Sequence, residues 1–365
     1  MQFTTTPYTE HQLIDASGNV TGTLPPWMQD QDLLLKFYRT MNLIRVFDKR
    51  AIALQRTGQM GTYASCLGQE AIGTAIGSAL KAEDVFVPYY RDQAAQFLRG
   101  VPLYQLLQYW GGSEWGNHFT GTAREDFPNC VPIATQITHA AGIATAFKIR
   151  GQKRAALVTC GDGATSRGDF YEPLNLAGVW QLPMVLVVNN NQWAISVPRA
   201  LQTGAPTIAQ KAMAAGIEGF QVDGNDVCAL YDSIRYALDK AHAGKGATLI
   251  EAMSYRLCDH TTADDATRYR SHEEVNAAWL KEPVKRLQTF LHQRGLWDEQ
   301  KEQQLITDCQ QKVEQAVKDF QSQPQQPVDD LFDYLFDTTP PHLIVQRERT
   351  KQKAARLAGD NHHGH

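Results

Sequence analysis

The sequence lacks several features that would place it in a membrane, on nucleic acid or outside the cell. No run of about 18 apolar residues occurs, so we expect no membrane span. The formal net charge is only −4 and no basic stripe is present, which disfavours nucleic-acid binding. The first residues lack the charged and apolar regions of a secretory signal. We therefore expect a globular cytoplasmic protein.

Cysteine pairs and the dinucleotide fingerprint are also missing. The six cysteines are scattered without a Cys-x-x-Cys spacing, which predicts reduced and mostly buried thiols. No Gly-x-Gly-x-x-Gly follows a strand, which disfavours a generic Rossmann dehydrogenase. A chain of 365 residues is nevertheless long enough to bury a substantial core.

Apolar periodicity and breaker residues predict the organisation of the chain. We expect an N-terminal arm over 1–29 and an α/β domain over 30–327, with C-terminal helices from about 271. A tail covers 328–365 and ends in a His-rich segment. Strands expected at 85–87, 155–160, 184–188, 220–222 and 249–253 alternate with helices expected at 69–80, 139–149, 169–180, 207–216 and 227–243. This alternation predicts a parallel sheet with helices on both faces.

Two polar motifs follow two of these strands. Gly161, Asp162 and Gly163 come directly after the first, and three asparagines, 189–191, directly follow the second. Because the helix between the strands makes a βαβ unit, we expect parallel neighbouring strands. Ligands of such sheets bind at the carboxyl ends of the strands. Asp162 and Asn191 should therefore reach one crevice.

The residue types suit a magnesium–diphosphate clamp. Magnesium takes about six oxygens and seldom obtains all of them from protein. One carboxylate, one amide oxygen and one backbone carbonyl leave room for two diphosphate oxygens and a water. Gly161 and Gly163 let the backbone come close to phosphates, and the N-terminus of the next helix supplies free N–H groups. Either motif alone is typical of a turn or of a strand end. The two motifs together, at the ends of neighbouring strands of a βαβ unit, favour the clamp.

The segments 161–172 and 191–196 resemble the thiamine-diphosphate motif. More narrowly, residues 33–327 resemble the alpha subunit of the dehydrogenase component of 2-oxoacid dehydrogenase complexes, closest to the pyruvate type. Matching motifs stand at 68–71, 88–92, 134–136, 221–224 and 259–261. The resemblance implies the diphosphate half of the thiamine-diphosphate-binding fold. It implies magnesium ligands Asp162, Asn191 and the carbonyl of Trp193, a position where the family usually has tyrosine or phenylalanine.

The resemblance also implies the remaining site residues. Arg91 could pair with a surface carboxylate, but the matching motif favours contact of Tyr90 and Arg91 with the diphosphate. Val131 and Ile133 would line the cofactor pocket. The polar stretch 258–270 is either a solvated connection or a functional loop, and the match makes His260 the active-site histidine. The implied cofactor-binding set is Tyr90, Arg91, Val131, Ile133, Asp162, Gly163, Ala164, Asn191, Trp193 and His260.

Three further features stay open at this stage. Gly73 and Gly77 indicate either tight core packing or a subunit contact. The resemblance implies for Thr135 and Gln136 a monovalent-cation site that some relatives have. Arg167 stands where the family has Glu or Gln, which puts in doubt an acidic path through neighbouring carboxylates.

The implied reaction is thiamine-diphosphate-dependent oxidative decarboxylation of pyruvate with reductive acetylation of a lipoyl group. His260 would hold the lipoyl group or donate a proton. In two-chain relatives a beta subunit supplies the glutamate that activates the cofactor, and we find no second pyrimidine-binding domain here. We therefore expect a heterotetramer of two alpha and two beta chains, which meets the lipoyl domain of a dihydrolipoyl acyltransferase. The alternatives are a branched-chain 2-oxoacid or acetoin dehydrogenase, and a non-catalytic scaffold or regulatory subunit.

Overall fold

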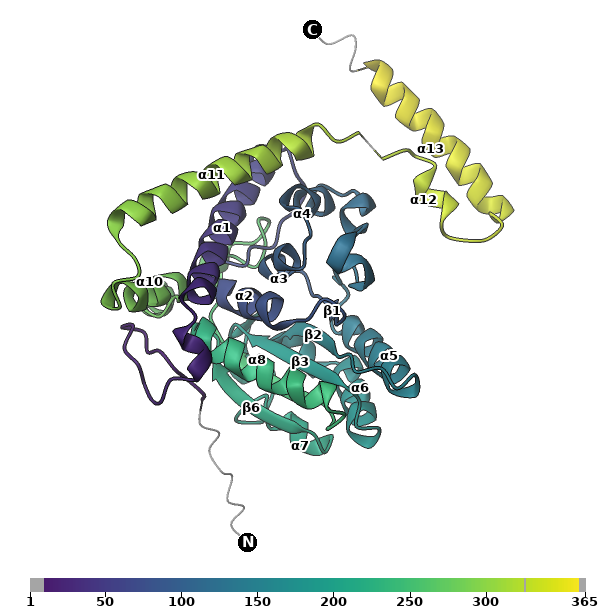
Figure 1. Cartoon of the computed structure of the whole chain (residues 1–365). Coiled ribbons are helices and arrows are strands. Elements are labelled where there is room, and N and C mark those ends of the chain that lie inside the picture. The colour runs from purple at the N-terminus through teal and green to yellow at the C-terminus, as the bar shows by residue number, and fades with distance from the viewer. Residues whose placement is uncertain (1–9, 325, 361–365) are drawn as a thin grey trace. The chain divides into compact units, whose positions relative to one another are not determined.

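The computed structural model describes residues 10–324 and 326–360, with side chains as far as 357 (Figure 1). The His-rich C-terminus and the start of the expected N-terminal arm lie outside these residues. The described chain divides into two units, of which the first ends at Lys318 and the second begins at Asp319. No helix in the described ranges is long and apolar enough to cross a membrane.

A parallel sheet of five strands in the order β1-β2-β3-β7-β6 forms the centre of the first unit. The strands β2 and β3 are parallel neighbours, as the βαβ pattern predicts, and the register places Gly161 opposite Asn189. Both polar motifs therefore begin at the same edge of the sheet. The strands are β1 (Val85–Val87), β2 (Ala156–Gly161), β3 (Met184–Asn190), β6 (Glu218–Asp223) and β7 (Thr248–Met253).

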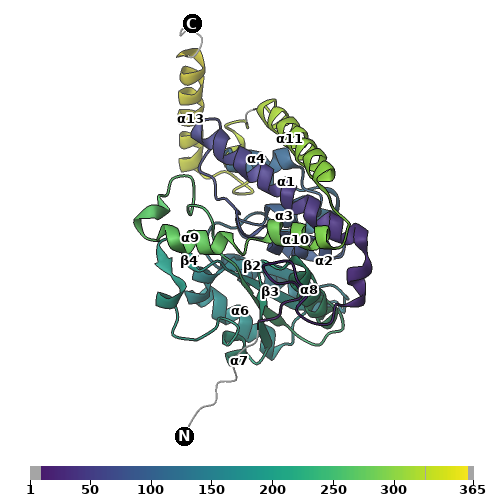
Figure 2. The ribbon, with the colours of Figure 1, turned by 90° about the vertical axis from the view of Figure 1, so that its left-hand side faces the viewer.

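Helices cover both faces of this sheet, which confirms the expected α/β class (Figures 1 and 2). On one face α5 (Thr135–Ile149) and α6 (Gly168–Val179) pack on alternate strand residues such as Val158 and Leu186. On the other face α8 (Val227–His242) packs on β3, β6 and β7. Strands buried on both faces need continuous apolar runs, which is what β2 and β3 contain.

A helical layer adjoins the α8 face. Asp30 caps α1 (Gln31–Arg56) by accepting a hydrogen bond from the backbone N–H of Leu33. The helix α2 (Glu70–Ala79) packs on α8 and on α3 (Gln93–Leu98). A Cβ atom at Gly73 or Gly77 would meet residues of α3 at 3.0 Å or less. These two glycines therefore serve close packing within this chain.

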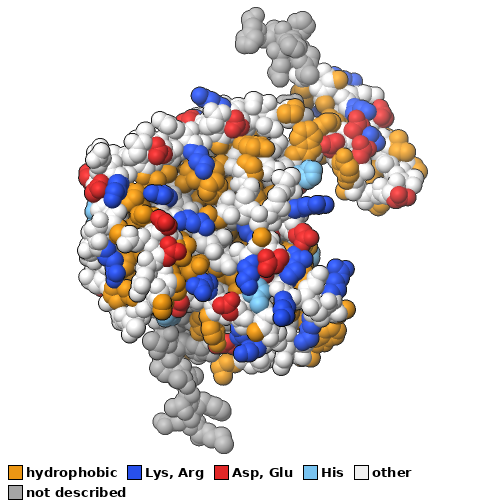
Figure 3. Space-filling view, in the orientation of Figure 1, with side chains coloured by type: hydrophobic (Ala, Val, Ile, Leu, Met, Phe, Trp, Pro, Cys, Tyr) orange, Lys and Arg blue, Asp and Glu red, His pale blue; other side chains and the backbone are white. Residues whose placement is uncertain are grey.

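Some of the remaining elements belong to the first unit and others form the second unit. Small strands β4 (Trp193–Ala194) and β5 (Val197–Pro198) pair antiparallel just after β3. Further helices of the first unit are α4 (Leu103–Trp110), α9 (His272–Trp279) and α10 (Pro283–Gln293), and α11 (Glu299–Gln321) runs past its end. The second unit contains α12 (Asp330–Asp333) and α13 (Pro341–Asp360), where Arg347 pairs with Asp329 and Asp333. Over the first unit, acidic and basic side chains are interspersed on the face of Figure 3.

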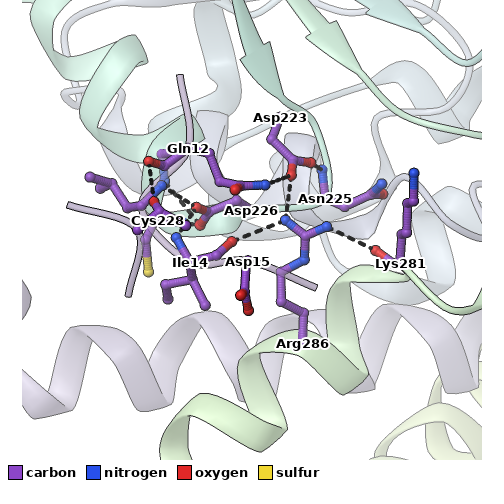
Figure 4. Close-up of polar contacts among 12 residues, drawn as sticks. Gln12, Ile14, Asp15, Asp223, Asn225, Asp226, Cys228, Lys281 and Arg286 are labelled. Atoms are coloured by element: carbon purple, nitrogen blue, oxygen red, sulfur yellow. Dashed lines mark hydrogen bonds and ion pairs between the residues drawn. The ribbon is translucent and has the colours of Figure 1, made fainter. Parts of the chain in front are cut away.

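The described part of the N-terminal segment is tied to the outer edge of β6. His11 forms a parallel bridge to Val222. The buried carboxylate of Asp226 accepts hydrogen bonds from the backbone N–H groups of Leu13 and Ile14, each at 2.7 Å (Figure 4). Its other oxygen accepts from two N–H groups in the first turn of α8. Arg286 of α10 adds a hydrogen bond to the Ile14 carbonyl.

Two expected helices differ from the structure. The helix expected over 207–216 is only the short α7 (Lys211–Ala214), and the N–H groups of Lys211, Ala212 and Met213 donate to carbonyl oxygens three residues back, the spacing of a 3-10 turn. Ala209 donates to Glu251 and Gln210 to Thr207. The helix expected from 139 already starts at Thr135, after Ala134 in a left-handed conformation with φ 73°. No capping side chain marks this start, so the sequence carries no signal for it.

Candidate active site

A cavity lies where β2 and β3 end, at the edge predicted for the clamp. The structure gathers there nearly all of the expected cofactor-binding residues. The exception is Val131, which is exposed and does not line the cavity. The lining residues are Tyr89, Tyr90, Arg91, Cys130, Ile133, Ala134, Gln136, Gly161, Asp162, Gly163, Ala164, Asn191, Trp193, Ala194, Ile195 and His260.

Asp162 contributes a buried carboxylate at the start of a 3-10 turn that follows β2. Its side chain is 2% exposed, and burial raises the pKa of the carboxyl above its usual range. Among the described residues it forms no ion pair, and its Oδ2 accepts a hydrogen bond from the side chain of Gln202 at 2.7 Å. At Gly163 a Cβ would lie 2.6 Å from that of Ala194, so glycine lets β4 approach the turn.

Asn191 directly follows β3, the parallel neighbour of the strand that leads into Asp162. Its side-chain Nδ2 donates to the side-chain oxygen of Gln69 at 3.0 Å. Its Oδ1 accepts a hydrogen bond from the backbone N–H of Trp193 at 3.3 Å. Among the described residues this long contact is the one hydrogen bond to the amide oxygen, which can accept a second.

Trp193 is held by contacts on both its backbone and its ring. Its carbonyl oxygen accepts from Nη1 of Arg256 at 3.3 Å. The indole N–H donates to Glu274 of α9 at 3.0 Å, and the ring lies 5.5 Å from that of Tyr269. The tryptophan therefore links the clamp to the segment that follows the polar loop.

Arg91 is buried at 4% exposure and pairs with no carboxylate among the described residues, so it is not a surface ion-pair residue. Its guanidinium donates to the carbonyl oxygens of Ser65 and His260, and its carbon lies 5.2 Å from the ring of Tyr90. A buried guanidinium held only by neutral acceptors retains its charge for an anion in the cavity.

His260 accepts hydrogen bonds from two arginines at one ring nitrogen. Nη2 of Arg91 lies 3.1 Å and Nη1 of Arg256 3.2 Å from its Nδ1. Burial and these two positive charges lower the pKa of the imidazole to about 3. The ring is therefore neutral near pH 7, with Nδ1 as acceptor and its proton on Nε2.

The loop 258–270 is fastened to the site rather than loosely solvated. The backbone N–H of His260 donates to Asp264 at 2.8 Å, and Tyr269 donates to the same carboxylate. Arg270 donates to the carbonyl oxygens of Arg256 and Cys258. These contacts hold His260 at the cavity.

The donor set fits an anion together with a hard cation. Within residues 10–324 and 326–360, buried Arg91 and Arg256 have no carboxylate partner, and buried Asp162 has no cationic partner. The described residues contain no group of three or more His, Cys, Asp or Glu side chains suited to a metal ion. One carboxylate, one amide oxygen and one carbonyl oxygen match the preference of magnesium for oxygen ligands, with phosphate oxygens completing its shell.

Three residues near the cavity had no role in the sequence analysis. Gln69 belongs to a motif that supported the resemblance, Arg256 follows the strand β7, and Gln202 lies in a loop without a pattern. Of the three, only Arg256 carries a signal in the sequence, because an arginine between a buried strand and a polar loop is a candidate site residue. The side chain of Arg167 is 60% exposed, pairs with Asp169 at 3.4 Å and does not line the cavity.

Comparison with known proteins identifies the family. Residues 38–329 match the model of the dehydrogenase E1 component. The chain belongs to the dehydrogenase E1 component family. This assignment confirms the resemblance seen in the sequence.

Named relatives in this family cover nearly the whole chain. The chain is 39% identical over 348 residues to the pyruvate dehydrogenase E1 component subunit alpha of Staphylococcus aureus, which covers 94% of this chain and 93% of the relative. It is 39% identical over 346 residues to the protein of the same name from Bacillus cereus, with the same coverage. It is also 40% identical over 326 residues to the 3-methyl-2-oxobutanoate dehydrogenase subunit alpha of Mycobacterium tuberculosis, covering 89% of each chain. The chain is thus an E1-type 2-oxoacid dehydrogenase subunit, an oxidoreductase.

Proposed function

We propose that this chain is the alpha subunit of a pyruvate dehydrogenase. It would act with thiamine diphosphate and magnesium to decarboxylate pyruvate and acetylate a lipoyl group. The observation that carries this proposal is the pairing of unsatisfied charges in one cavity. The guanidinium of Arg91 has no anion and the carboxylate of Asp162 has no cation among the described residues. A magnesium diphosphate would satisfy both.

In this proposal, Asp162, Asn191 and the carbonyl of Trp193 hold magnesium. Arg91 and Tyr90 bind the diphosphate, and Arg256 keeps the Trp193 carbonyl and His260 in place. When bound, thiamine diphosphate would supply a nucleophilic carbon for the keto group of the substrate and a positively charged ring as the electron sink for decarboxylation. His260 presents its Nε2 proton to the group that accepts the acyl unit, since its Nδ1 is engaged by the arginines.

The lining of the cavity supports a site shared with a second chain. Among the described residues that line it, Asp162 is the only carboxylate, and in this proposal it holds the metal. The carboxylate that protonates the aminopyrimidine ring would therefore come from a beta subunit. We place this chain in a heterotetramer of two alpha and two beta chains that delivers its acyl group to the lipoyl domain of a dihydrolipoyl acyltransferase. The six free thiols favour a reducing, cytoplasmic location.

A branched-chain 2-oxo acid is the second candidate substrate. The Mycobacterium tuberculosis relative is named for 3-methyl-2-oxobutanoate and is as similar to this chain as the pyruvate-named relatives. Part of the substrate pocket would come from the beta chain, so this chain alone carries only part of the selectivity.

The test is decarboxylation assayed on this chain alone and co-expressed with its candidate beta subunit, with thiamine diphosphate and magnesium present. Activity only in the mixture is expected, and pyruvate is then ranked against 3-methyl-2-oxobutanoate. Robust turnover by the isolated chain would contradict the shared site. No activity in either sample with cofactor still bound would favour a scaffold role or another substrate.

A further inference from the structure

Gln69 is a buried side chain that contacts the clamp from outside the cavity. It directly precedes α2 and is 2% exposed. Its side-chain Oε1 accepts hydrogen bonds from Nδ2 of Asn191 at 3.0 Å and from Nδ2 of Asn189 at 2.8 Å. It therefore receives an N–H from the proposed metal ligand Asn191 and from the asparagine two residues before it.

An asparagine that binds a metal must direct its amide oxygen, and not its NH₂ group, toward the ion. Its oxygen and its NH₂ group lie at equivalent ends of a planar amide, but only the oxygen coordinates a cation. An amide free to rotate by half a turn would present its nitrogen part of the time. Asn191 does not have this freedom, because its NH₂ group is bound to Gln69.

The polarity of this contact is set by the backbone N–H of Trp193, which can only donate and faces Oδ1 of Asn191, so the NH₂ group of Asn191 points toward Gln69. Deeper in the protein, the hydroxyl of Ser254 donates to Oδ1 of Asn189 at 2.6 Å, and the NH₂ group of Asn189 donates to Gln69. This NH₂ group also donates to the hydroxyl oxygen of Tyr89 at 2.7 Å. Gln69 therefore faces two NH₂ groups, and only its oxygen can point at them without repulsion.

The opposite end of the Gln69 amide supports this reading. Its Nε2 is buried and has no hydrogen-bond partner among the described residues. A buried donor left unpaired is unfavourable, so this end of the amide contributes no hydrogen bond to the fold. The part of the side chain that is used is the acceptor.

We propose that Gln69 is a positioning residue that fixes the amide of Asn191 so that its oxygen faces the cation. The inference rests on the proposed magnesium site and adds to it a residue that touches neither metal nor cofactor. The chain of contacts runs from Ser254 through Asn189 and Gln69 to Asn191.

The test measures Mn²⁺ binding in place of Mg²⁺, in the presence of thiamine diphosphate. Free Mn²⁺ is read by electron paramagnetic resonance on the full chain co-purified with its beta partner and stripped of metal and cofactor. Gln69→Met, which removes the acceptor, should weaken Mn²⁺ binding about tenfold. Gln69→Glu keeps an acceptor and should retain the wild-type affinity or exceed it. Gln93→Met removes another buried glutamine, one that does not line the cavity, and should leave Mn²⁺ binding unchanged.

A second background separates orientation from general damage. A carboxylate carries oxygen on both arms, so Asn191→Asp makes the orientation irrelevant. In that background Gln69→Met should change Mn²⁺ affinity by less than about twofold. Equal losses in both backgrounds, or equal losses in Gln69→Met and Gln69→Glu, would overturn the proposal. Full Mn²⁺ binding by Gln69→Met would overturn it while leaving the proposed function intact, whereas a wild-type protein that binds no Mn²⁺ would overturn both.

Discussion

The carboxylate of Asp162 accepts a hydrogen bond from the side chain of Gln202 over 2.7 Å and forms no ion pair with any described residue. A neutral amide compensates only part of the cost of burying a carboxylate, and the pKa of this group is raised by burial. Asp162 is therefore ready to accept a cation.

We expect Asp162→Asn to remove metal-dependent cofactor binding while leaving the fold intact. The substitution keeps the shape but removes the charge that attracts magnesium. The loss in affinity for thiamine diphosphate with Mg²⁺ should reach about 100-fold, or about 2.7 kcal/mol. Isothermal titration of the metal-free protein measures it. The same change at the exposed Asp239 serves as control, and unchanged binding by Asp162→Asn would contradict its role as a ligand.

His260→Gln should impair acyl transfer more than decarboxylation. The histidine lies at the cavity with its Nε2 proton free for a substrate, whereas the clamp residues do not depend on that proton. Acetylation of a lipoyl domain should fall about 100-fold, and decarboxylation with an artificial electron acceptor should fall far less. Equal losses in the two assays would assign His260 to the first step or to cofactor binding instead.

Asp92→Asn should alter the pH dependence of stability. Burial raises the pKa of this carboxyl to about 7 from an ordinary value of 3.8. Between these pH values the folded chain holds a proton that the unfolded chain has released, so the wild type loses stability as pH rises through this window. The variant cannot ionise at this position. Its free energy of unfolding relative to that of the wild type should therefore rise by about 3 kcal/mol from pH 5 to pH 8. Urea unfolding at both pH values measures this gain, and parallel curves for the two proteins would contradict it.

Asp226→Ala should loosen the N-terminal segment. The carboxylate accepts N–H groups from Leu13, Ile14 and the first turn of α8, and all would lose a buried partner. We expect a loss of about 2–4 kcal/mol in unfolding free energy and faster proteolysis within residues 10–20. Asp15→Ala is the control, since its exposed carboxylate also accepts backbone N–H groups but should cost under about 1 kcal/mol. Similar losses of unfolding free energy in the two variants would contradict the role of Asp226 in holding the N-terminal segment.

The two clamp motifs could be predicted from the sequence because each directly follows the strand that positions it. A strand that runs into Gly161 and Asp162, and a second that runs into Asn191, place both motifs at one edge of a parallel sheet, as the register of β2 and β3 shows. The helices on both faces follow from the same alternation. The full strand order does not, because the position of β7 between β3 and β6 depends on packing over long distances.

The supporting residues could not be predicted because they reach the site from distant segments. Gln69 meets Asn191 across 122 positions of sequence and Arg256 meets Trp193 across 63. Neither contact produces a periodic or spaced pattern. The contact just before α7 was not predicted either, since Glu251 on β7, which accepts the N–H of Ala209, lies 42 positions away.

The two arginines at His260 have a consequence for the chain before it meets its cofactor. Arg91 and Arg256 bring two like charges to one ring nitrogen inside the protein, and the pKa of Arg256 is lowered by burial and by Arg91. The repulsion that prepares the cavity for an anion also weakens the empty chain. Binding of an anionic ligand would offset this repulsion and raise the free energy of unfolding. We therefore expect the chain to resist unfolding and proteolysis better with an anionic ligand bound at these arginines than without it.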